Sequence, residues 1–222
     1  MTPPRSSPLH QALSELAPVW GQINQMPVAR DFAPTPAGQC SRLAIGDHSA
    51  LTRFGVKGPH AAAWLADHGV TLPTLPNSWL PMAGGARVAR LGVSEFFIED
   101  GEQSAFAPLL TRASSAPPPG VYPVLRQDAA LVLIGSALPD LLLQTCSVNV
   151  VALDLRTRPV LLTNMVGVGV LAIMAPTRDG TPALRLWCDA AYGDYLWRTL
   201  LGIVCELGGA AVGFDYCRSM FD

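Results

Sequence analysis

The residues most suggestive of chemistry form a G-x-G-x-x-A run, Gly167–Ala172, which follows an apolar stretch. Asp189 comes 20 residues after the second glycine, the spacing at which dinucleotide-binding folds place a ribose-binding acid. Such a site needs a helix directly after the glycines, because the first amides of that helix hold the pyrophosphate. Pro176, the Asp179–Gly180 turn and Pro182 leave no room for this helix, and β-branched residues favour a strand. The sequence therefore disfavours a nucleotide site here.

Metal-binding and nucleophilic motifs are missing from the sequence. His60 and His68 are eight residues apart on one predicted helix, which is too far for a local pair of ligands. The five cysteines include no C-x-x-C pair, and no serine lies in a G-x-S-x-G elbow. We therefore predict no metal site and no catalytic residue, and we do not expect the chain to be catalytic alone.

Four carboxylates border predicted strands, where active sites are often found. Asp100 and Asp189 each precede a predicted helix, so capping accounts for both. Glu95 and Asp154 have no such structural explanation and remain candidates for ligand binding. Among the aromatic residues near the last predicted strand and helix, Trp187 and Tyr192 could either stack on a flat heterocycle or pack in the core.

Composition excludes several classes of protein. Of the 222 residues, 50% are hydrophobic and 14% are charged, and the formal net charge is −2. This balance offers no basic face for nucleic acid. The longest strongly apolar stretch, Val166–Ala175, is about half the roughly 20 residues that a membrane-spanning helix requires. We expect a cytoplasmic protein with free thiols that binds neither nucleic acid nor membrane.

Each half of the chain repeats one pattern of elements. Leu51–Val56 and Ala129–Ile134 are apolar strands, each followed by a glycine and a helix. The halves then close on hairpins and a helix, and the predicted hairpin strands are Arg87–Leu91, Glu95–Glu99, Val160–Met165, Val168–Met174 and Leu184–Cys188. We expect Pro108 to kink or break the helix that closes the first half. The prediction is an α+β fold with pseudo-repeats at about residues 41–115 and 121–214. A loosely ordered arm over residues 1–40 precedes them, and its only periodic piece is a short helix near Leu9–Leu16.

Several of these stretches resemble the gamma subunit of heterotetrameric sarcosine oxidase, a family related to the folate-binding domain of the glycine cleavage aminomethyltransferase. The resemblance covers roughly residues 41–214 and rests on Thr52–Leu65, Asn77–Trp79, Arg90–Ile98 and Arg185–Leu201. It implies duplicated, interleaved β/α subdomains that form a folate-binding-like domain over residues 41–222. It also implies a non-catalytic accessory subunit of a tetrahydrofolate-linked complex that demethylates sarcosine oxidatively, with a larger flavoprotein subunit as partner.

The same resemblance makes Glu95, Asp154, Trp187 and Tyr192 candidates for a folate pocket. Aligned with the acidic hairpin of the aminomethyltransferase, Thr181 stands where that family has its pterin-binding glutamate. Arg185 replaces a second acid. A hydroxyl cannot accept the paired hydrogen bonds that a carboxylate offers, so the sequence disfavours folate binding in the usual way of the family. Two alternatives stay open: a free-standing tetrahydrofolate-binding or aminomethyltransferase-like protein, and a structural module that reuses the fold for an unrelated partner.

Overall fold

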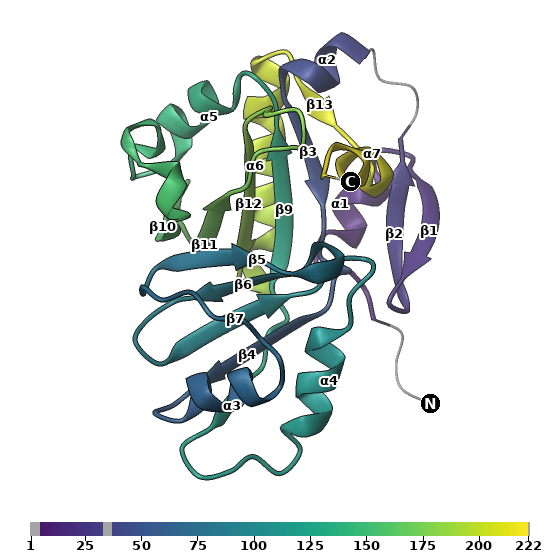
Figure 1. Ribbon diagram of the computed structural model, residues 1–222. Coiled ribbons are helices and arrows are strands. Elements are labelled where there is room, and N and C mark those ends of the chain that lie inside the picture. Colours follow the sequence, from purple (N-terminus) through teal and green to yellow (C-terminus); the bar gives the residue numbers. More distant parts are fainter. Residues whose placement is uncertain (1–4, 33–36, 222) are drawn as a thin grey trace. The chain divides into compact units, whose positions relative to one another are not determined.

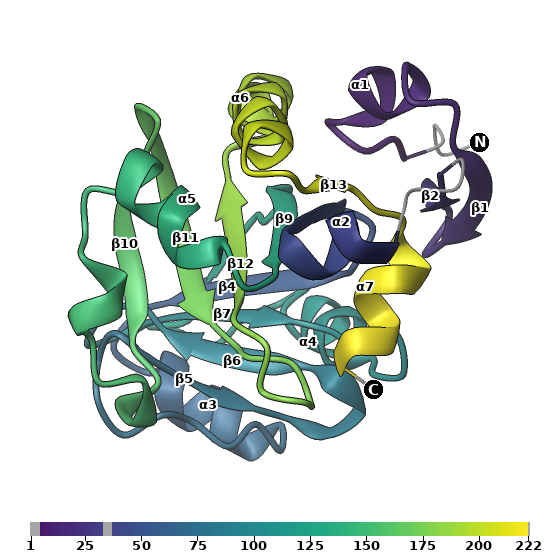
Figure 2. The same cartoon turned by 90° about the horizontal axis from the view of Figure 1, so that it is seen from above.

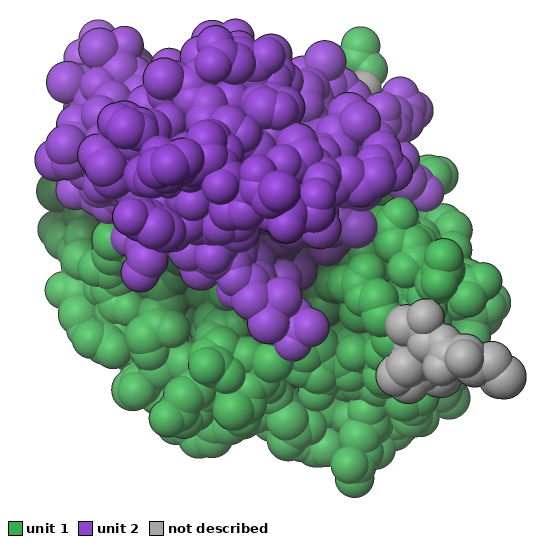
Figure 3. Space-filling view, turned by 90° about the horizontal axis from the view of Figure 1, so that it is seen from below, with its two compact units in different colours: residues 1–50, 128–153, 161–222 green, residues 51–127, 154–160 purple. Residues whose placement is uncertain are grey.

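A computed structural model describes residues 5–32 and 37–221 of the chain (Figure 1). These residues divide into two compact units. Unit 1 contains the chain up to Ala50, residues 128–153 and the chain from residue 161 onward, and unit 2 contains residues 51–127 and 154–160 (Figure 3). The chain therefore leaves unit 1 and returns to it twice.

Unit 2 is built on an antiparallel sheet in the order β5-β6-β7-β4-β8. The strands are β4 (Arg53–Lys57), β5 (Ser78–Pro81), β6 (Arg87–Arg90), β7 (Glu95–Glu99) and β8 (Tyr122–Val124). Alternate residues, such as Phe54, Phe96 and Ile98, point to one face and form an apolar core with helices α3 (Ala61–Asp67) and α4 (Phe106–Ala113). The other residues of the same strands carry most of this sheet's charged groups.

Unit 1 is built on a sheet in the order β10-β11-β12-β9-β3-β13. The strands are β3 (Ala44–Asp47), β9 (Ala129–Ile134), β10 (Val160–Met165), β11 (Val168–Met174), β12 (Ala183–Cys188) and β13 (Ala210–Ala211). Helices α1 (His10–Ser14), α5 (Leu138–Thr145) and α6 (Gly193–Glu206) share the core of one face. Helices α2 (Ala37–Arg42) and α7 (Phe214–Phe221) contribute to a smaller core on the other face (Figure 2).

The same sequence of elements occurs in both units. Unit 2 runs β4-α3-β5-β6-β7-α4 and unit 1 runs β9-α5-β10-β11-β12-α6, and the four strands have equivalent positions in the two sheets. The strand in the fifth position of each sheet, β8 in unit 2 and β3 in unit 1, lies outside these two runs of elements. Strand β3 precedes β4 in sequence but pairs with β9, whereas β8 precedes β9 but pairs with β4.

The predicted strands of both halves are present, because a run of apolar and β-branched residues bounded by turn residues is a local signal. Leu51–Val56 is shifted by two residues at its start and by one at its end, to Arg53–Lys57. Ala129–Ile134, Glu95–Glu99, Val160–Met165 and Val168–Met174 are strands with the predicted bounds. The glycines of the G-x-G-x-x-A run lie at the β10–β11 turn and in β11, so no helix follows them.

The predicted loosely ordered arm is corrected for the residues that the structure describes. Residues 5–32 contain α1 and a hairpin of β1 (Val19–Ile23) and β2 (Met26–Asp31). Leu9 and Leu13 are fully buried in the core of unit 1. The short helix that periodicity predicts near Leu9–Leu16 is α1, and because a helix this short is not stable alone, its packing against the core keeps it ordered. Residues 1–4 and 33–36 of the predicted arm lie outside the described residues, and the repeat boundaries remain predictions.

The kink expected at Pro108 is also corrected. Helix α4 begins at Phe106, so Pro108 lies in its first turn. The amides of the first turn have no partner within the helix, and proline is therefore tolerated at this position.

Candidate functional site

The most unusual residue of unit 1 is Arg185, a buried cation in the middle of the sheet. It lies on β12, opposite Ile173 of β11 and Val132 of β9, and is only 5% exposed. Its Nη1 is 3.2 Å from Nδ1 of His48. Because a guanidinium only donates hydrogen bonds, Nδ1 of His48 must accept, which places the ring proton on Nε2. The pair is thus a cation next to a neutral imidazole.

Polar residues at the end of β3 and directly after it are held in place beside this pair. The Asp47 carboxylate accepts hydrogen bonds from Ser7 Oγ at 2.7 Å and from the Ser49 amide at 2.8 Å. The Ser49 hydroxyl accepts from the Ala130 amide at 3.0 Å, and the His48 amide donates to the Ala130 carbonyl at 2.8 Å. An aspartate that bonds the amide two residues on makes a tight turn, so the local sequence positions His48.

Helix α7 covers the Arg185–His48 pair. The Phe221 ring lies under the guanidinium carbon of Arg185 at 4.4 Å, and the Phe214 ring stacks on His48 with 4.6 Å between ring centroids. Between them, Cys217 is completely buried. Burial raises the pKa of the Cys217 thiol to about 12, with Arg185 opposing and Asp47 adding to the rise. This thiol therefore stays protonated and unreactive at neutral pH.

Unit 2 has its own buried charges, on the sheet face away from α3 and α4. Glu99 receives hydrogen bonds from Arg53 Nε at 2.8 Å and from Arg87 Nη1 at 2.9 Å, and the Glu99 side chain is 1% exposed. Burial, opposed by Glu99, lowers the pKa of Arg87. On the same face Arg126 lies over the Phe97 ring at 4.7 Å. These groups engage one another, so their arrangement is that of a structural ion-pair network.

The two predicted carboxylates both belong to unit 2, and the structure gives one of them a local role. Asp154 is exposed and caps a short 3₁₀ helix, Leu155–Thr157. Its oxygens accept from Arg156 Nε at 2.9 Å and Nη2 at 3.0 Å, and these side-chain bonds, more than the bond from the Arg156 amide, lower the pKa of Asp154. Glu95 is half-buried at the start of β7, opposite Lys57.

The two predicted aromatic residues belong to unit 1 and differ in exposure. Trp187 lies in β12, is 2% exposed and shares the face of Arg185, two residues away. Tyr192 is 56% exposed in the turn that precedes α6. The role of Glu95, Asp154, Trp187 and Tyr192 in a folate pocket remains a prediction.

Thr181 lies in the hairpin between β11 and β12, where the resemblance places it. Its amide donates to Asp179 Oδ1 at 3.1 Å, and its carbonyl accepts from the Thr177 amide at 3.0 Å. Both bonds serve the turn. The hydrogen bonds from Thr177 and Thr181 also lower the pKa of Asp179.

Sequence reasoning missed the polar cluster of unit 1. The signals were present: Asp47 ends a short apolar strand, His48 and Ser49 follow it directly, and Arg185 interrupts another strand that is otherwise apolar. His48 stands in a turn-rich, polar stretch, which is typical of exposed loops. Only the tertiary structure brings it to a strand more than 130 residues away.

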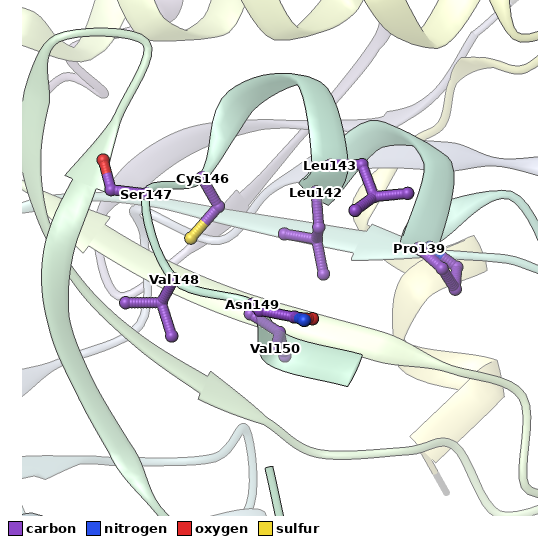
Figure 4. A pocket seen from close by; sticks show the side chains of 8 residues that line it. All are labelled: Pro139, Leu142, Leu143, Cys146, Ser147, Val148, Asn149 and Val150. Atoms are coloured by element: carbon purple, nitrogen blue, oxygen red, sulfur yellow. The ribbon is translucent and has the colours of Figure 1, made fainter. Parts of the chain in front are cut away.

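A small pocket lies in unit 1 beside the end of α5 (Figure 4). Its volume is about 230 Å³, and its lining consists of Pro139, Leu142, Leu143, Cys146, Ser147, Val148, Asn149 and Val150. Its lining combines apolar side chains with polar groups, and no lining residue carries a charge. Within residues 5–32 and 37–221, no group of three or more histidine, cysteine or acidic residues could hold a metal ion. None of the helices described is long and apolar enough to cross a membrane.

Comparisons with known proteins identify the type of fold. No protein-family model and no curated protein matches the sequence. The glycine cleavage system aminomethyltransferase T from Bartonella henselae matches in structure with a TM-score of 0.73 and 14% identity, over 98% of this chain and 62% of that one. The chain therefore has an α+β fold of the aminomethyltransferase type, and it spans less than two thirds of that protein's length.

A second structural neighbour is a chain of the heterotetrameric sarcosine oxidase from Corynebacterium sp. U-96, solved in complex with pyrrole 2-carboxylate. It matches with a TM-score of 0.64 and 21% identity, over 93% of this chain and 97% of that one. Both proteins to which the sequence resemblance points are thus structural neighbours of this chain. At these identities the likeness establishes the fold.

Proposed function

We propose that this chain is a non-catalytic, gamma-like accessory subunit of a cytoplasmic, sarcosine-oxidase-type complex linked to tetrahydrofolate. One observation carries the proposal: the match extends over 97% of a chain of a heterotetrameric sarcosine oxidase, but over only 62% of the aminomethyltransferase. A match over nearly the whole length of one chain of a multisubunit enzyme supports a role as one subunit of such a complex. A larger flavoprotein subunit would be its partner.

The polar groups of the two units support a non-catalytic role. The Arg53–Glu99–Arg87 network is buried and internally paired, and the Arg185–His48 pair lies under α7. Thr181 uses its backbone groups for a turn. Buried charges that are paired within the chain suit a structural role. A catalytic acid or base would instead have to reach a substrate in order to transfer a proton.

We also infer that the two units derive from a duplicated, interleaved pair of subdomains. The equivalent order of four strands in both sheets supports this origin. So does the exchange of the fifth strand, with β3 on β9 and β8 on β4. Without a common origin, the two units would share their strand order by chance and would also exchange β3 and β8 by chance.

Association with the partner tests the accessory role. The tagged chain is co-expressed with the larger flavoprotein subunit of a sarcosine-oxidase-type enzyme from the same cell and analysed by size-exclusion chromatography with light scattering. We expect one complex that contains both chains and carries the flavin absorbance. A monodisperse monomer that elutes apart from the flavoprotein would refute the proposal.

The alternative, a free-standing tetrahydrofolate-binding or aminomethyltransferase-like protein, is favoured by the higher TM-score of the aminomethyltransferase match. Calorimetric titration of the purified chain with 5-formyltetrahydrofolate tests it. Saturable heat that is lost in a Glu95→Gln, Asp154→Asn variant would support this alternative. Binding that survives both substitutions would remove these two carboxylates from the site.

A further inference from the structure

One end of the unit 2 sheet adjoins segments that carry no charge. β4 ends there at Lys57, and β7 begins there at Glu95, directly opposite. The adjoining segments are residues 58–60, 73–76, 91–94 and 117–122, and none of them contains an aspartate, glutamate, lysine or arginine. We call these four segments the loop end of unit 2. Because charged residues are depleted at the centre of protein interfaces, such a composition is typical of a surface that another protein covers.

Large apolar groups are exposed on the loop end. Leu75, Val93 and Tyr122 are 65%, 78% and 55% exposed. A single exposed apolar side chain is normal, but a group of them bordered by polar residues marks an interaction site. The strand ends supply this border with Lys57 and Glu95. Proline rings are exposed on the same segments, at positions 59, 76 and 117–119.

Arg90, the last residue of β6, joins two of the four segments. Its guanidinium donates hydrogen bonds to the carbonyls of Pro73 and Thr74, at 3.2 and 2.8 Å. It also donates to the carbonyls of Gly92 and Val93, at 3.2 and 2.8 Å. The planar fork of an arginine presents its donors in a fixed geometry, so one side chain holds both loops in place.

Hydrogen bonds also join the other two segments to this pair. Nδ1 of His60 lies 2.8 Å from the Pro119 carbonyl oxygen, and because a carbonyl only accepts, the ring nitrogen donates. The His60 amide donates to the Gly120 carbonyl at 3.1 Å, and the Gly58 amide donates to the Ser94 carbonyl at 2.9 Å. The four segments are therefore one continuous surface. Their order exists before any partner binds, which lowers the entropic cost of association.

The composition of the loop end indicates what kind of partner fits it. Exposed prolines are recognised by aromatic side chains, because the rigid proline ring offers an apolar surface and loses little entropy on binding. A membrane fits less well, since anionic lipid headgroups attract lysine and arginine, which the four segments lack. The surface that covers the loop end should therefore carry aromatic side chains and no charge at its centre.

We propose that the loop end of unit 2 is the surface that binds the larger flavoprotein subunit, whose aromatic side chains pack on the exposed prolines and on Leu75, Val93 and Tyr122. The assignment rests on the proposed accessory role and gives that role its interface.

The test measures the affinity of the purified chain for the purified flavoprotein subunit by biolayer interferometry. The variant Leu75→Asp, Val93→Asp places two carboxylates in the loop end. Leu143→Asp, Leu162→Asp is the matched control, because these leucines are 72% and 58% exposed but belong to unit 1. All four side chains are exposed, so urea denaturation should give the wild-type stability for both variants.

We expect the dissociation constant to rise at least about 100-fold in the loop-end variant and to change less than about twofold in the control. Two measurements on the intact surface accompany the variants. Hydrogen exchange should show the amides of the four segments to be more protected in the complex than in the free chain. A photoreactive p-benzoylphenylalanine in place of Val93 should cross-link to a flavoprotein peptide that contains an aromatic residue.

Several results would overturn the assignment. If the wild type and the loop-end variant bind the flavoprotein subunit equally well, the interface lies elsewhere, although the accessory role stands. If the wild type does not bind that subunit at all, the accessory role fails and the interface with it. Light scattering that shows a dimer of the chain alone, lost in the loop-end variant, would assign the surface to a second copy. Sedimentation with phosphatidylglycerol vesicles, lost in the same variant, would assign it to a membrane.

Discussion

Glu99 lies between two guanidinium groups on a buried sheet face, and its neutralisation would leave both cations without this counter-charge. Arg53 and Arg87 contact different oxygens of the carboxylate, at 2.8 and 2.9 Å. Removing one member of a buried ionic network is strongly destabilising, because the remaining charges cannot return to water. At the scale of single residues, this network is the most sensitive feature of unit 2.

We expect Glu99→Gln to lower the free energy of unfolding by about 3 to 5 kcal/mol, measured by urea denaturation. Asp154→Asn is the matched control. It also removes a carboxylate bonded to an arginine, but the pair with Arg156 is exposed to solvent, and we expect no measurable change. Equal effects of the two substitutions would contradict the structural role of Glu99.

At the scale of elements, Asp100 ties β7 to α4. Its carboxylate accepts from the amides of Phe106 at 2.8 Å and Ala107 at 3.0 Å, at the start of the helix. It also accepts from the hydroxyls of Thr52 at 2.8 Å and Ser104 at 2.9 Å. One buried side chain therefore satisfies four donors, two of which belong to the unpaired first turn of α4.

Asp100→Ala should cost about 2 to 4 kcal/mol of stability, because it removes the cap and leaves buried donors unpaired. Asp189→Ala provides the comparison: Asp189 is exposed and bonds only the Ala191 amide among the described residues, at 2.8 Å, so we expect about 0.5 to 1 kcal/mol. Thermal and urea unfolding both measure the difference. A ranking in the opposite order would mean that α4 does not depend on its cap.

Helix α1 is a second element that depends on tertiary packing. Leu13 is 1% exposed and lies in the same core as Leu196 and Leu200 of α6. We expect Leu13→Ala to destabilise the protein by about 2 to 5 kcal/mol, as other large-to-small core substitutions do. Leu143→Ala, on α5 but 72% exposed, should change little. If Leu13→Ala were as mild as Leu143→Ala, the packing of α1 would contribute little to the stability of unit 1.

One edge strand of each sheet is bridged at a single residue by another segment of the chain. In unit 1, Met165 at the end of β10 forms an antiparallel β-bridge with Cys146. In unit 2, β5 is closed by the bridge between Ser78 and Pro159, and β8 contains Pro123. Covered or proline-bearing edges discourage pairing with other chains.

At the scale of the whole molecule, buried thiols couple stability to alkaline pH. Burial, more than the neighbouring carboxylates, raises the pKa of Cys188 to about 12, and burial likewise raises the pKa of Cys217 to about 12. In the unfolded chain both thiols ionise near their ordinary pKa of 9.0. Because the folded pKa is higher, the unfolded state releases protons first as the pH rises.

The free energy of unfolding should therefore be unaffected by these thiols below about pH 9 and should fall between about pH 9 and about pH 12. Urea denaturation at a series of alkaline pH values measures the slope. We expect a shallower slope for Cys188→Ala, Cys217→Ala. Cys205→Ala, which removes an exposed thiol, should leave the slope unchanged. An identical slope in all three proteins would rule out the buried cysteines as its source.

The sequence by itself determined the local elements of the repeated pattern. Strands such as Ala129–Ile134 and Val168–Met174, the capping aspartates Asp100 and Asp189, and the absence of a helix after Gly169 all follow from signals within a few residues. Periodicity and capping are local, because they depend on backbone geometry and on neighbours in the chain.

Only the tertiary structure decided which distant residues meet. It paired Arg185 with His48, placed Glu99 between Arg53 and Arg87, and ordered α1 against α6. It also assigned Glu95 and Asp154 to unit 2, and Trp187 and Tyr192 to unit 1. Burial of a charge or of a short helix is favourable only when a partner far away in sequence is already in place, and no local pattern records that partner.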